Sequence, residues 1–311
     1  MRFGSAVKLI FTAAAGLALA AGALAASRPA GTSGNAAYLG SFTWRSPQGW
    51  FGGFSALEIA KDGQSMIVIS DRATIALVSL QRNEGRITAA EILGANALLS
   101  SRGKPLKGFA GDSEGIAVTP DGTICISYEG VPRVACHQTA GSRAAVLPRH
   151  APFKALPGNK ALEALAIDSR GHLFTLPEGA VTPGGDIPVW RWNGTGWSHV
   201  FSLPRRENFK PVSADFGPDG RLYVLERDFG ILGFRSRLRR WSVSASGLSG
   251  EETLLKTPMG RHDNLEGLSV WQDSSGLLRA TMVSDDNFNG FQRTELVEYA
   301  LPDSIGGTVS P

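Results

Sequence analysis

The sequence predicts an all-β fold, a β-propeller built from four-stranded blades, and three observations favour it. The chain has 38 Gly and 17 Pro among 311 residues and only 19 % charged residues, which is typical of many short strands joined by tight turns. One pattern occurs five times: a small or acidic residue, an apolar run, a glycine turn, a second apolar run and an acidic residue. The turn glycines lie 59, 49, 49 and 56 residues apart, a period that fits propeller blades: Gly63, Gly122, Gly171, Gly220 and Gly276.

The first 25 residues have the features of a signal peptide. Basic residues open it, an apolar run extends from Leu9 to Leu24, and Ala23-Leu24-Ala25 forms a cleavage site of small residues. We therefore expect export to a periplasm or the medium by the general route, with no membrane span after the leader is removed. The alternative is an uncleaved anchor, although the apolar run of about 16 residues is short for a bilayer span. Residues 26–37 are expected to be a flexible N-terminus, residues 38–303 the propeller, and residues 304–311 a flexible tail.

The strands of each repeat are predicted in order around the turn glycine. The first two strands form a hairpin, and a third follows in every repeat: 75–80, 133–138, 189–192, 238–243 and 295–301. A fourth strand follows in all repeats but the last. Residues 38–44 have the pattern of a strand without a partner, so we expect them to complete the last blade and close the ring. The sequence favours five blades, with six as the alternative if an irregular blade lies near residues 88–110.

Acidic residues recur at both ends of the predicted inner hairpins. In a regular antiparallel hairpin, residues equally distant from the turn face each other, which pairs Glu114 with Glu129. The same rule pairs Glu163 with Glu178 and Glu266 with Asp285, all on one rim of the central channel. Carboxylates directly opposite each other repel, so positive charge is expected between them.

Two sources of that positive charge remain open. Blades one and four have Ser55 and Val212 in place of the first acid, and their second acid precedes an arginine, in Asp71-Arg72 and Glu226-Arg227. Arg72 and Arg227 would then reach an acid pair of the adjacent blade in a structural salt-bridge network. Alternatively, the rim holds Ca²⁺ or another hard cation, because such ions take six or more oxygen ligands. The expected ligands are Glu114, Glu129, Glu163, Glu178, Glu266, Asp285 and Asp286, with Asn264 and Asn287 beside them.

Several of these segments together resemble a known family. They are Ser70-Asp71-Arg72, Asp112-Ser113-Glu114-Gly115, Leu225-Glu226-Arg227-Asp228-Phe229, Asp263-Asn264-Leu265-Glu266-Gly267 and Ser284-Asp285-Asp286-Asn287-Phe288. In these motifs the chain is similar to the phytase-like family, also described as "esterase-like activity of phytase", over residues 38–301. The resemblance implies a β-propeller exported in bacteria, with phosphoester or ester hydrolase activity and calcium by analogy with propeller phytases.

Two classes of function follow from these residues. As a hydrolase, the protein would hold a cation at the acidic rim, and Arg72 or Arg227 would stabilise charge on a small-molecule or envelope substrate. Asp71 and Glu226, which precede these arginines, complete the expected catalytic set. As a non-catalytic binding or scaffold propeller, the protein would use the same rim only to bind a partner. The formal charge of +3 gives no reason to expect a nucleic acid partner, and we expect a monomer.

The two cysteines are predicted to form a disulfide. Cys125 lies in the second strand and Cys136 in the third strand of the second repeat, at equal distances from a turn at Gly130-Val131. Opposed residues of an antiparallel pair are close enough for a disulfide, and an exported location permits oxidation. The alternative is a pair of buried thiols.

Overall fold

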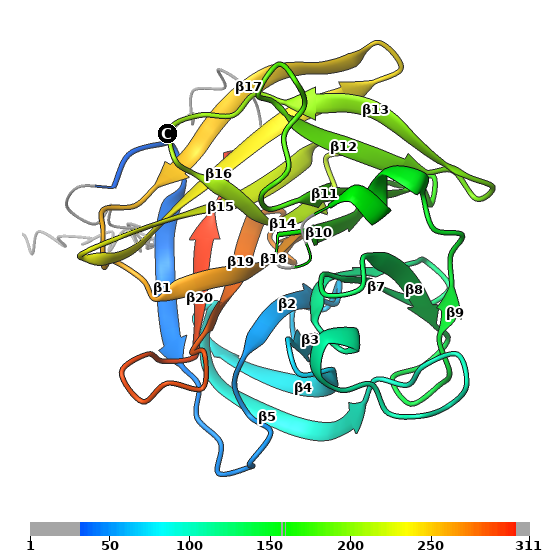
Figure 1. Ribbon diagram of the computed structural model, residues 1–311. Helices are drawn as coiled ribbons and strands as arrows, with labels where there is room; N and C mark the ends of the chain where they lie inside the picture. The colour runs from blue at the N-terminus through cyan, green and yellow to red at the C-terminus, as the bar shows by residue number, and fades with distance from the viewer. Residues whose placement is uncertain (1–31, 157, 159, 303–311) are drawn as a thin grey trace, which may run out of the picture.

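The computed structural model of the protein describes residues 32–156, 158 and 160–302 (Figure 1). Within these residues, the strands form five four-stranded antiparallel sheets arranged in a ring, which makes the fold a five-bladed β-propeller. The five-blade prediction is confirmed. The six-blade alternative is wrong, because residues 88–110 contain β5 (Arg86–Ala97), a loop and the short 3₁₀ helix η1 (Gly108–Ala110). The predicted leader and tail lie outside the described residues.

Each blade runs from its innermost strand at the channel to its outermost strand at the surface. Blade 1 contains β2 (Phe54–Ile59), β3 (Ser65–Ser70), β4 (Thr74–Asn83) and β5. Blade 2 contains β6 (Ser113–Val118), β7 (Ile124–Tyr128), β8 (Arg133–His137) and β9 (Ala145–Val146). Blade 3 contains β10 (Leu162–Ile167), β11 (Leu173–Pro177), β12 (Ile187–Trp192) and β13 (Trp197–Leu203). Blade 4 contains β14 (Lys210–Phe216), β15 (Leu222–Gly230), β16 (Gly233–Ser244) and β17 (Gly247–Lys256).

Blade 5 joins the two ends of the described chain and closes the ring. It contains β18 (Asn264–Gln272), β19 (Leu278–Asp285), β20 (Glu295–Ala300) and β1 (Ala37–Thr43). β1 pairs antiparallel with β20, and Figure 1 shows the blue strand beside the red one. The predicted closure is therefore confirmed. Before β1, the backbone of Ser33 exchanges two hydrogen bonds with Lys256, of 2.9 and 2.8 Å, which attaches this segment to blade 4.

The same tight turn ends all five inner hairpins. The five turn glycines have φ between 67° and 87°, a left-handed region that only glycine enters without strain. In each turn the glycine N–H donates to the carbonyl oxygen three residues earlier, at 2.8 to 2.9 Å. The repeated glycine that revealed the blades in the sequence thus has a direct conformational role.

The core lies between neighbouring blades. One cluster, for example, packs Leu225 and Leu238 of blade 4 against Leu268 and Val297 of blade 5. Near the channel the inner strands approach so closely that side chains must be small. A Cβ added to Gly115 would lie 2.6 Å from the backbone nitrogen of Leu165 in the next blade.

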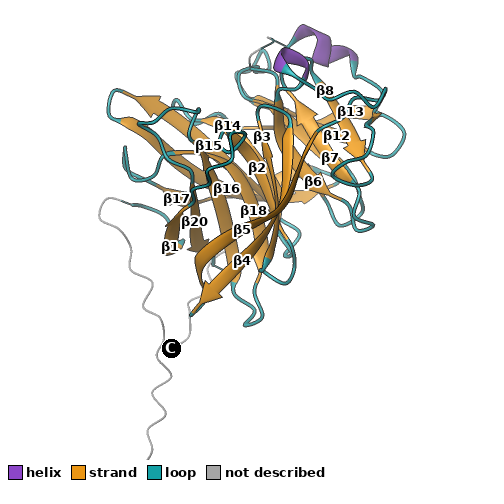
Figure 2. Cartoon of the chain, turned by 90° about the horizontal axis from the view of Figure 1, so that it is seen from below, coloured by secondary structure: helices purple, strands orange, loops and turns teal. Residues whose placement is uncertain are grey.

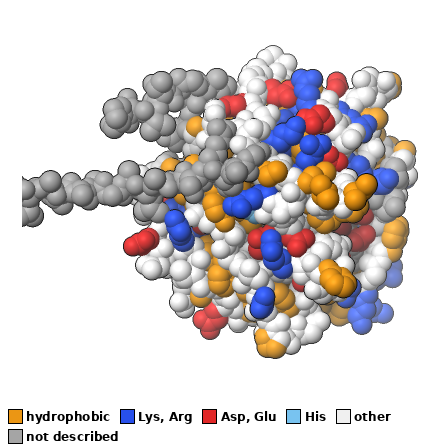
Figure 3. All heavy atoms as spheres, turned by 90° about the vertical axis from the view of Figure 1, so that its left-hand side faces the viewer, with side chains coloured by type: hydrophobic (Ala, Val, Ile, Leu, Met, Phe, Trp, Pro, Cys, Tyr) orange, Lys and Arg blue, Asp and Glu red, His pale blue; other side chains and the backbone are white. Residues whose placement is uncertain are grey.

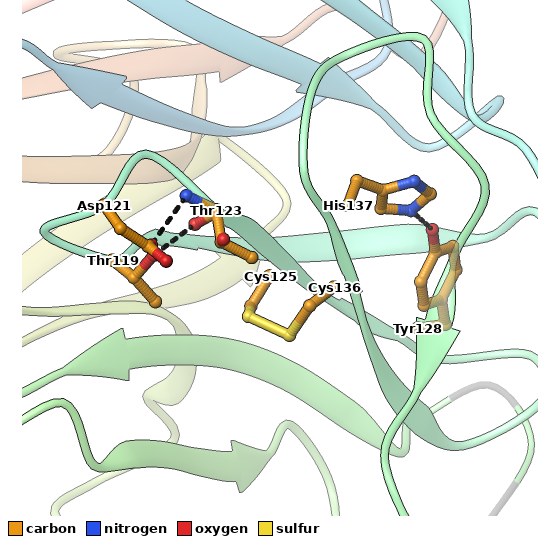
Figure 4. The surroundings of a disulfide bond; sticks show 7 residues. All are labelled: Thr119, Asp121, Thr123, Cys125, Tyr128, Cys136 and His137. Carbon is orange, nitrogen blue, oxygen red and sulfur yellow. Dashed lines mark hydrogen bonds between the residues drawn. A yellow bond between two sulfur atoms is a disulfide. The ribbon is translucent and has the colours of Figure 1, made fainter.

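Cys125 of β7 and Cys136 of β8 are directly paired in register and form a disulfide (Figure 4). The predicted disulfide is confirmed, and no described cysteine is free. The bond is compatible with export, because disulfides persist mainly in oxidising compartments. In the described part of the chain, no helix has the length and apolar character needed to cross a bilayer.

The ring has two distinct faces. On one, here called the entry face, the inner strands begin, and on the other, the turn face, the inner hairpins turn at their glycines. The 3₁₀ helices η1 and η2 (Ala151–Ala155) directly precede the inner strands of blades 2 and 3, and Figure 2 shows helical turns at the upper edge of the ring. The outer side of the ring shown in Figure 3 carries acidic, basic and hydrophobic side chains intermixed.

Candidate functional site

Every inner hairpin contains a β-bulge close to the entry face. In each blade the register shifts at one residue of the inner strand, so that two residues there face one on the second strand. The residues at these bulges are Ser55, Glu114, Glu163, Val212 and Glu266.

The bulges correct the predicted acid pairs. Glu114, Glu163 and Glu266 do not face Glu129, Glu178 and Asp285, because each first acid sits on a bulge without a direct partner. Instead the backbone nitrogen of Glu129 donates to the carbonyl oxygen of Asp112 at 2.9 Å. Asp285 pairs with Asn264. Residues equally distant from the turn face each other only in a regular ladder. The bulge adds one residue to the inner strand and so shifts the partners of the residues beyond it.

Two groups of residues surround the channel entrance. The first is the bulge residues, and the second lies on the opposite chain of each hairpin, one residue beyond the pair that precedes the bulge. The second group consists of Asp71, Glu129, Glu178, Arg227 and Asp285. We call the seven carboxylates of both groups, together with Asp112, the acidic mouth. In blade 4 the equivalent position holds Arg227 rather than Glu226, because Glu226 pairs with Pro211 one step earlier.

Arg227 neutralises one side of the acidic mouth. Its guanidinium donates to Asn264 Oδ1 at 2.7 Å and to Glu178 Oε1 at 3.2 Å, and it forms a salt bridge with Glu266. Lys210 Nζ adds a contact of 3.4 Å to Glu178. The predicted interblade network therefore exists at Arg227, where it joins blades 3, 4 and 5.

The other side of the mouth holds three carboxylates close together. One oxygen each from Asp112, Glu114 and Glu129 lies within 4.8 Å of the other two. No basic side chain in the described part of the chain forms a salt bridge with them. Asp112 was not among the predicted ligands. Its position in the Asp112-Ser113-Glu114 segment was the available signal, but the bulge that brings it opposite Glu129 was not visible in the sequence.

Burial and mutual repulsion raise the pKa values of the mouth carboxylates. Burial raises the pKa of Glu114 well above its ordinary value, and the charges of Glu163 and Glu266 raise it further. Burial, and then the charge of Asp112, raises the pKa of Glu129 to about 7. The pKa of Asp285 rises to about 8 for the same kinds of reason, with burial as the main cause. Carboxyl groups with such pKa values remain protonated near neutral pH unless a bound cation displaces the protons.

Arg72 lies beside the mouth but does not reach an acid pair, contrary to the predicted network. Its guanidinium carbon stacks 3.3 Å from the centre of the Phe288 ring, and the side chain is exposed. Neighbouring Asp71 has a buried Oδ1 without a hydrogen-bond partner among the described residues. Burial, as the main cause, raises the pKa of Asp71 to about 6, against the opposing effect of Arg72.

The loop after β19 holds Phe288 in place. Asn287 and Phe288 both have positive φ, 48° and 49°, a conformation that is unfavourable for side-chain-bearing residues. Asp286 compensates, because its Oδ1 accepts hydrogen bonds of 3.0 Å from the backbone nitrogens of Phe288 and Gly53. Its Oδ2 accepts from Thr294 Oγ1 at 3.0 Å. Asp286, an expected metal ligand, thus has both oxygens engaged in holding the loop.

Glu226 is placed in a buried ion cluster away from the acidic mouth. It is fully buried, and its Oε2 accepts hydrogen bonds from Arg237 at 2.6 Å and Arg239 at 2.8 Å. Arg239 also contacts Glu251 at 2.8 Å. Because both of its oxygens are occupied by arginines, this geometry assigns Glu226 to packing within blade 4.

A five-bladed ring with clustered carboxylates at one channel entrance defines a β-propeller with a candidate cation site. The family model Phytase-like, described as "Esterase-like activity of phytase", matches residues 49–288. The chain belongs to this family. No curated protein matches it.

Solved structures similar to this chain include a catalytically inactive virginiamycin B lyase from Staphylococcus aureus with quinupristin. The identity is 12 %, the TM-score is 0.43, and the match covers 85 % of this chain and 75 % of that one. Another is a protein of unknown function from Dyadobacter fermentans, with 11 % identity, a TM-score of 0.43, and coverage of 90 % and 89 %.

Proposed function

We propose that this protein is an exported hydrolase of phosphoester or ester bonds that works with a divalent cation, Ca²⁺ by preference, at the acidic mouth. The observation that carries the proposal is the group Asp112, Glu114 and Glu129, whose oxygens lie within 4.8 Å of one another. An all-oxygen donor set of carboxylates fits a hard cation. The raised pKa values fit as well, because a cation would relieve the repulsion that raises them.

The side chains around the mouth have separate roles in this proposal. A bound cation supplies polarisation of a substrate oxygen and a lower pKa for bound water. Arg72, exposed and stacked on Phe288, stabilises negative charge on the substrate. Asp71 accepts a proton from the attacking water, because its pKa of about 6 lies close to the working range of a general base.

Arg227 stays outside the chemistry in this arrangement. Its donors are engaged with Glu178, Glu266 and Asn264, so it holds the three blades together rather than binding substrate. Glu163, buried between the two sides of the mouth, is available as a further cation ligand, and so is Asp285. The expected substrate is a small phosphoester or ester, or a component of the cell envelope.

The test uses the mature chain, residues 26–311, stripped of metal and then assayed with and without Ca²⁺. p-Nitrophenyl phosphate and p-nitrophenyl acetate are the substrates. We expect Ca²⁺-dependent turnover, and a decrease of at least roughly 10-fold in Glu129→Gln, because losing a direct ligand should cost no less than losing an outer-shell partner of a metal site. Glu91→Gln, an exposed acid of β5, is the matched control and should retain full activity.

A non-catalytic binding propeller is the second candidate. The salt bridges of Arg227 support it, because ion pairs that join three blades fit a structural role for this part of the rim. Calorimetric binding of Ca²⁺ without turnover of either ester would support this function and contradict the hydrolase. Absence of both binding and turnover would leave the rim as a structural feature only.

Export is supported by the Cys125–Cys136 disulfide. Cell fractionation should find the mature protein in the periplasm or medium. A protein of full length in the cytoplasm would contradict this part of the proposal.

A further inference from the structure

A large cavity opens on the turn face, at the end of the channel opposite the acidic mouth. It has a volume of about 1090 Å³ and is lined by residues of blades 1 to 4. This volume lies just above the range of small-molecule sites, roughly 300–1,000 Å³, so the cavity can hold a small organic ligand. Its walls are mostly apolar, and include Ile59, Met66, Val118, Ile167, Phe216 and Val243.

Apolar side chains remain accessible on the wall that blade 1 contributes. Leu93 is 66 % exposed and Leu77 is 42 % exposed, and both line the cavity. Large apolar side chains gain free energy when they are covered, at roughly 25 cal/mol per Å² of buried surface. The cavity is therefore suited to an apolar ligand body.

The cavity also contains an unpartnered carboxylate, Glu58 of β2. Two other carboxylates line the cavity and have partners: Asp168 binds His172 Nδ1 at 3.1 Å, and Asp219 accepts from the Tyr223 hydroxyl at 2.8 Å. For Glu58, the described residues supply neither a salt bridge nor a hydrogen bond to the carboxylate. Lys61 is exposed at the edge, and Arg170, 66 % exposed, is bound to Asp168, so neither neutralises Glu58.

A second acid lies at the same level of the channel. Asp215 is equivalent to Glu58 in blade 4, since each lies three residues after the bulge of its inner strand. Other blades have Ala117, Ala166 and Ser269 there. Burial raises the pKa of Glu58, and the charge of Asp215 raises it further. Asp215 Oδ2 accepts a hydrogen bond of 2.6 Å from the Val270 nitrogen, which leaves Glu58 as the carboxylate without a partner.

We propose that this cavity binds a small organic cation with an apolar body, such as an arylalkyl amine, whose ammonium group pairs with Glu58. The apolar walls cover the body of the ligand. The ammonium group supplies the positive partner that no described residue provides for the Glu58 carboxylate. Glu58 is half-buried, so water screens its charge less than that of an exposed carboxylate, and it gains more from such pairing. The site is separate from the acidic mouth and does not depend on the proposed hydrolysis.

The test compares two fluorescent probes that share one apolar group. Dansylcadaverine carries a primary ammonium, and dansylamide is neutral. We expect mature protein to enhance and blue-shift dansylcadaverine emission, with a Kd at least 10-fold lower than that of dansylamide. In Glu58→Gln the two probes should bind equally, while Glu84→Gln, an exposed acid in the β4–β5 turn, should behave as the native protein.

A second variant tests the same pocket at an exposed position, Leu93, where we expect a substitution to leave folding intact. Leu93→Lys places a cation at the exposed wall. It should raise the Kd of dansylcadaverine at least five-fold and change the Kd of dansylamide by less than two-fold. Equal affinity of native protein for both probes, or an unchanged Kd for dansylcadaverine in a folded Glu58→Gln, would overturn the proposal. Calcium-dependent turnover in Glu58→Gln should remain native, which separates this site from the mouth.

Discussion

Arg72 and Arg227 show how two repeats assign different roles to the same residue type. Both follow an acid, Asp71 directly after β3 and Glu226 within β15. Because of the bulge in blade 4, the Arg227 side chain lies in the acidic mouth, where it forms salt bridges with Glu178 and Glu266. Arg72 lies one step beyond the equivalent position and stacks on Phe288 instead. A shift of one residue along the strand thus makes Arg227 part of a structural ion bridge and leaves Arg72 available to a ligand.

The two arginines should therefore differ in their contribution to stability. Arg227→Ala leaves Glu266 partly buried without its cation and Glu178 with only the Lys210 contact, and we expect a loss of about 3 kcal/mol, near the lower end for broken buried pairs. Arg72→Ala removes a cation–π contact at the surface and should cost about 0.5–1 kcal/mol. Urea unfolding of both variants measures the difference. Equal losses would contradict the assignment.

At the scale of the elements, the inner strands are constrained from both sides. Their bulges direct acids toward the entrance, and their small residues permit the close approach of neighbouring blades. Gly115 illustrates the second constraint, because an added Cβ would meet Leu165 N at 2.6 Å and Glu163 O at 2.7 Å. These are backbone atoms of the next inner strand, which cannot move without shifting a blade.

A pair of glycine substitutions tests this packing. We expect Gly115→Ala to destabilise the protein by about 2–3 kcal/mol, the upper range for overpacking a core. Gly94→Ala in β5 has open space around the new Cβ and should change stability by less than about 1 kcal/mol. Thermal unfolding checks both, and a neutral Gly115→Ala would show that the blades have room to separate.

β1 completes blade 5 from the N-terminal side, so its removal should affect the whole ring. Deletion of residues 26–45 exposes the edge of β20 and removes the link between the first and last blades. We expect loss of a cooperative thermal transition or a decrease in Tm of more than about 10 °C, larger than a single substitution gives in a domain of this size. Truncation after Asp303 is the control. An unchanged Tm in the deletion would rule out closure by β1.

At the scale of the whole molecule, the channel has chemically different ends. The entry face gathers carboxylates around its opening, and only Arg227 and Lys210 pair with them in the described residues. The turn face opens into the mostly apolar cavity with Glu58 inside it. A single channel thus offers an ionic site at one end and an amphipathic site at the other.

The stability of the whole ring should depend on pH and on divalent cations. Folding raises the pKa of Asp71 to about 6, of Glu129 to about 7 and of Asp285 to about 8, so the folded state binds more protons than the unfolded chain. From these groups we expect the free energy of unfolding to fall as pH rises from about 4 to 8. For each additional proton that the folded state holds, the decrease is up to about 1.4 kcal/mol per pH unit.

The measurement is Tm in chelator and in Ca²⁺ at pH 5 and pH 8. In chelator we expect a lower Tm at pH 8 than at pH 5. Ca²⁺ should restore the loss at pH 8 and have little effect at pH 5, because protons compete for the same oxygens. A chelator-insensitive Tm at both values would mean that Arg227 alone balances the mouth.

The number of blades, the turns and the closure could all be predicted from the sequence. The five glycine turns, the recurring apolar runs and the unpaired strand at residues 38–44 report local conformation and period, which follow from residue type and spacing. The Cys125–Cys136 disulfide was also predictable, because its hairpin has a regular ladder without a bulge. In such regular segments, counting residues from a turn gives the correct partner.

Which acids meet at the entrance depends on the tertiary structure. A bulge adds one residue to each inner strand, and neither Glu114 nor Glu163 differs locally from a regular strand residue in the sequence. That single residue moves Asp112 opposite Glu129, brings Arg227 into the mouth and leaves Glu226 in a buried cluster. The contacts at the entrance join side chains of different blades, more than 30 residues apart in the case of Arg227 and Asn264. Their arrangement depends on ring closure and strand register, which are properties of the folded whole and not of any one segment.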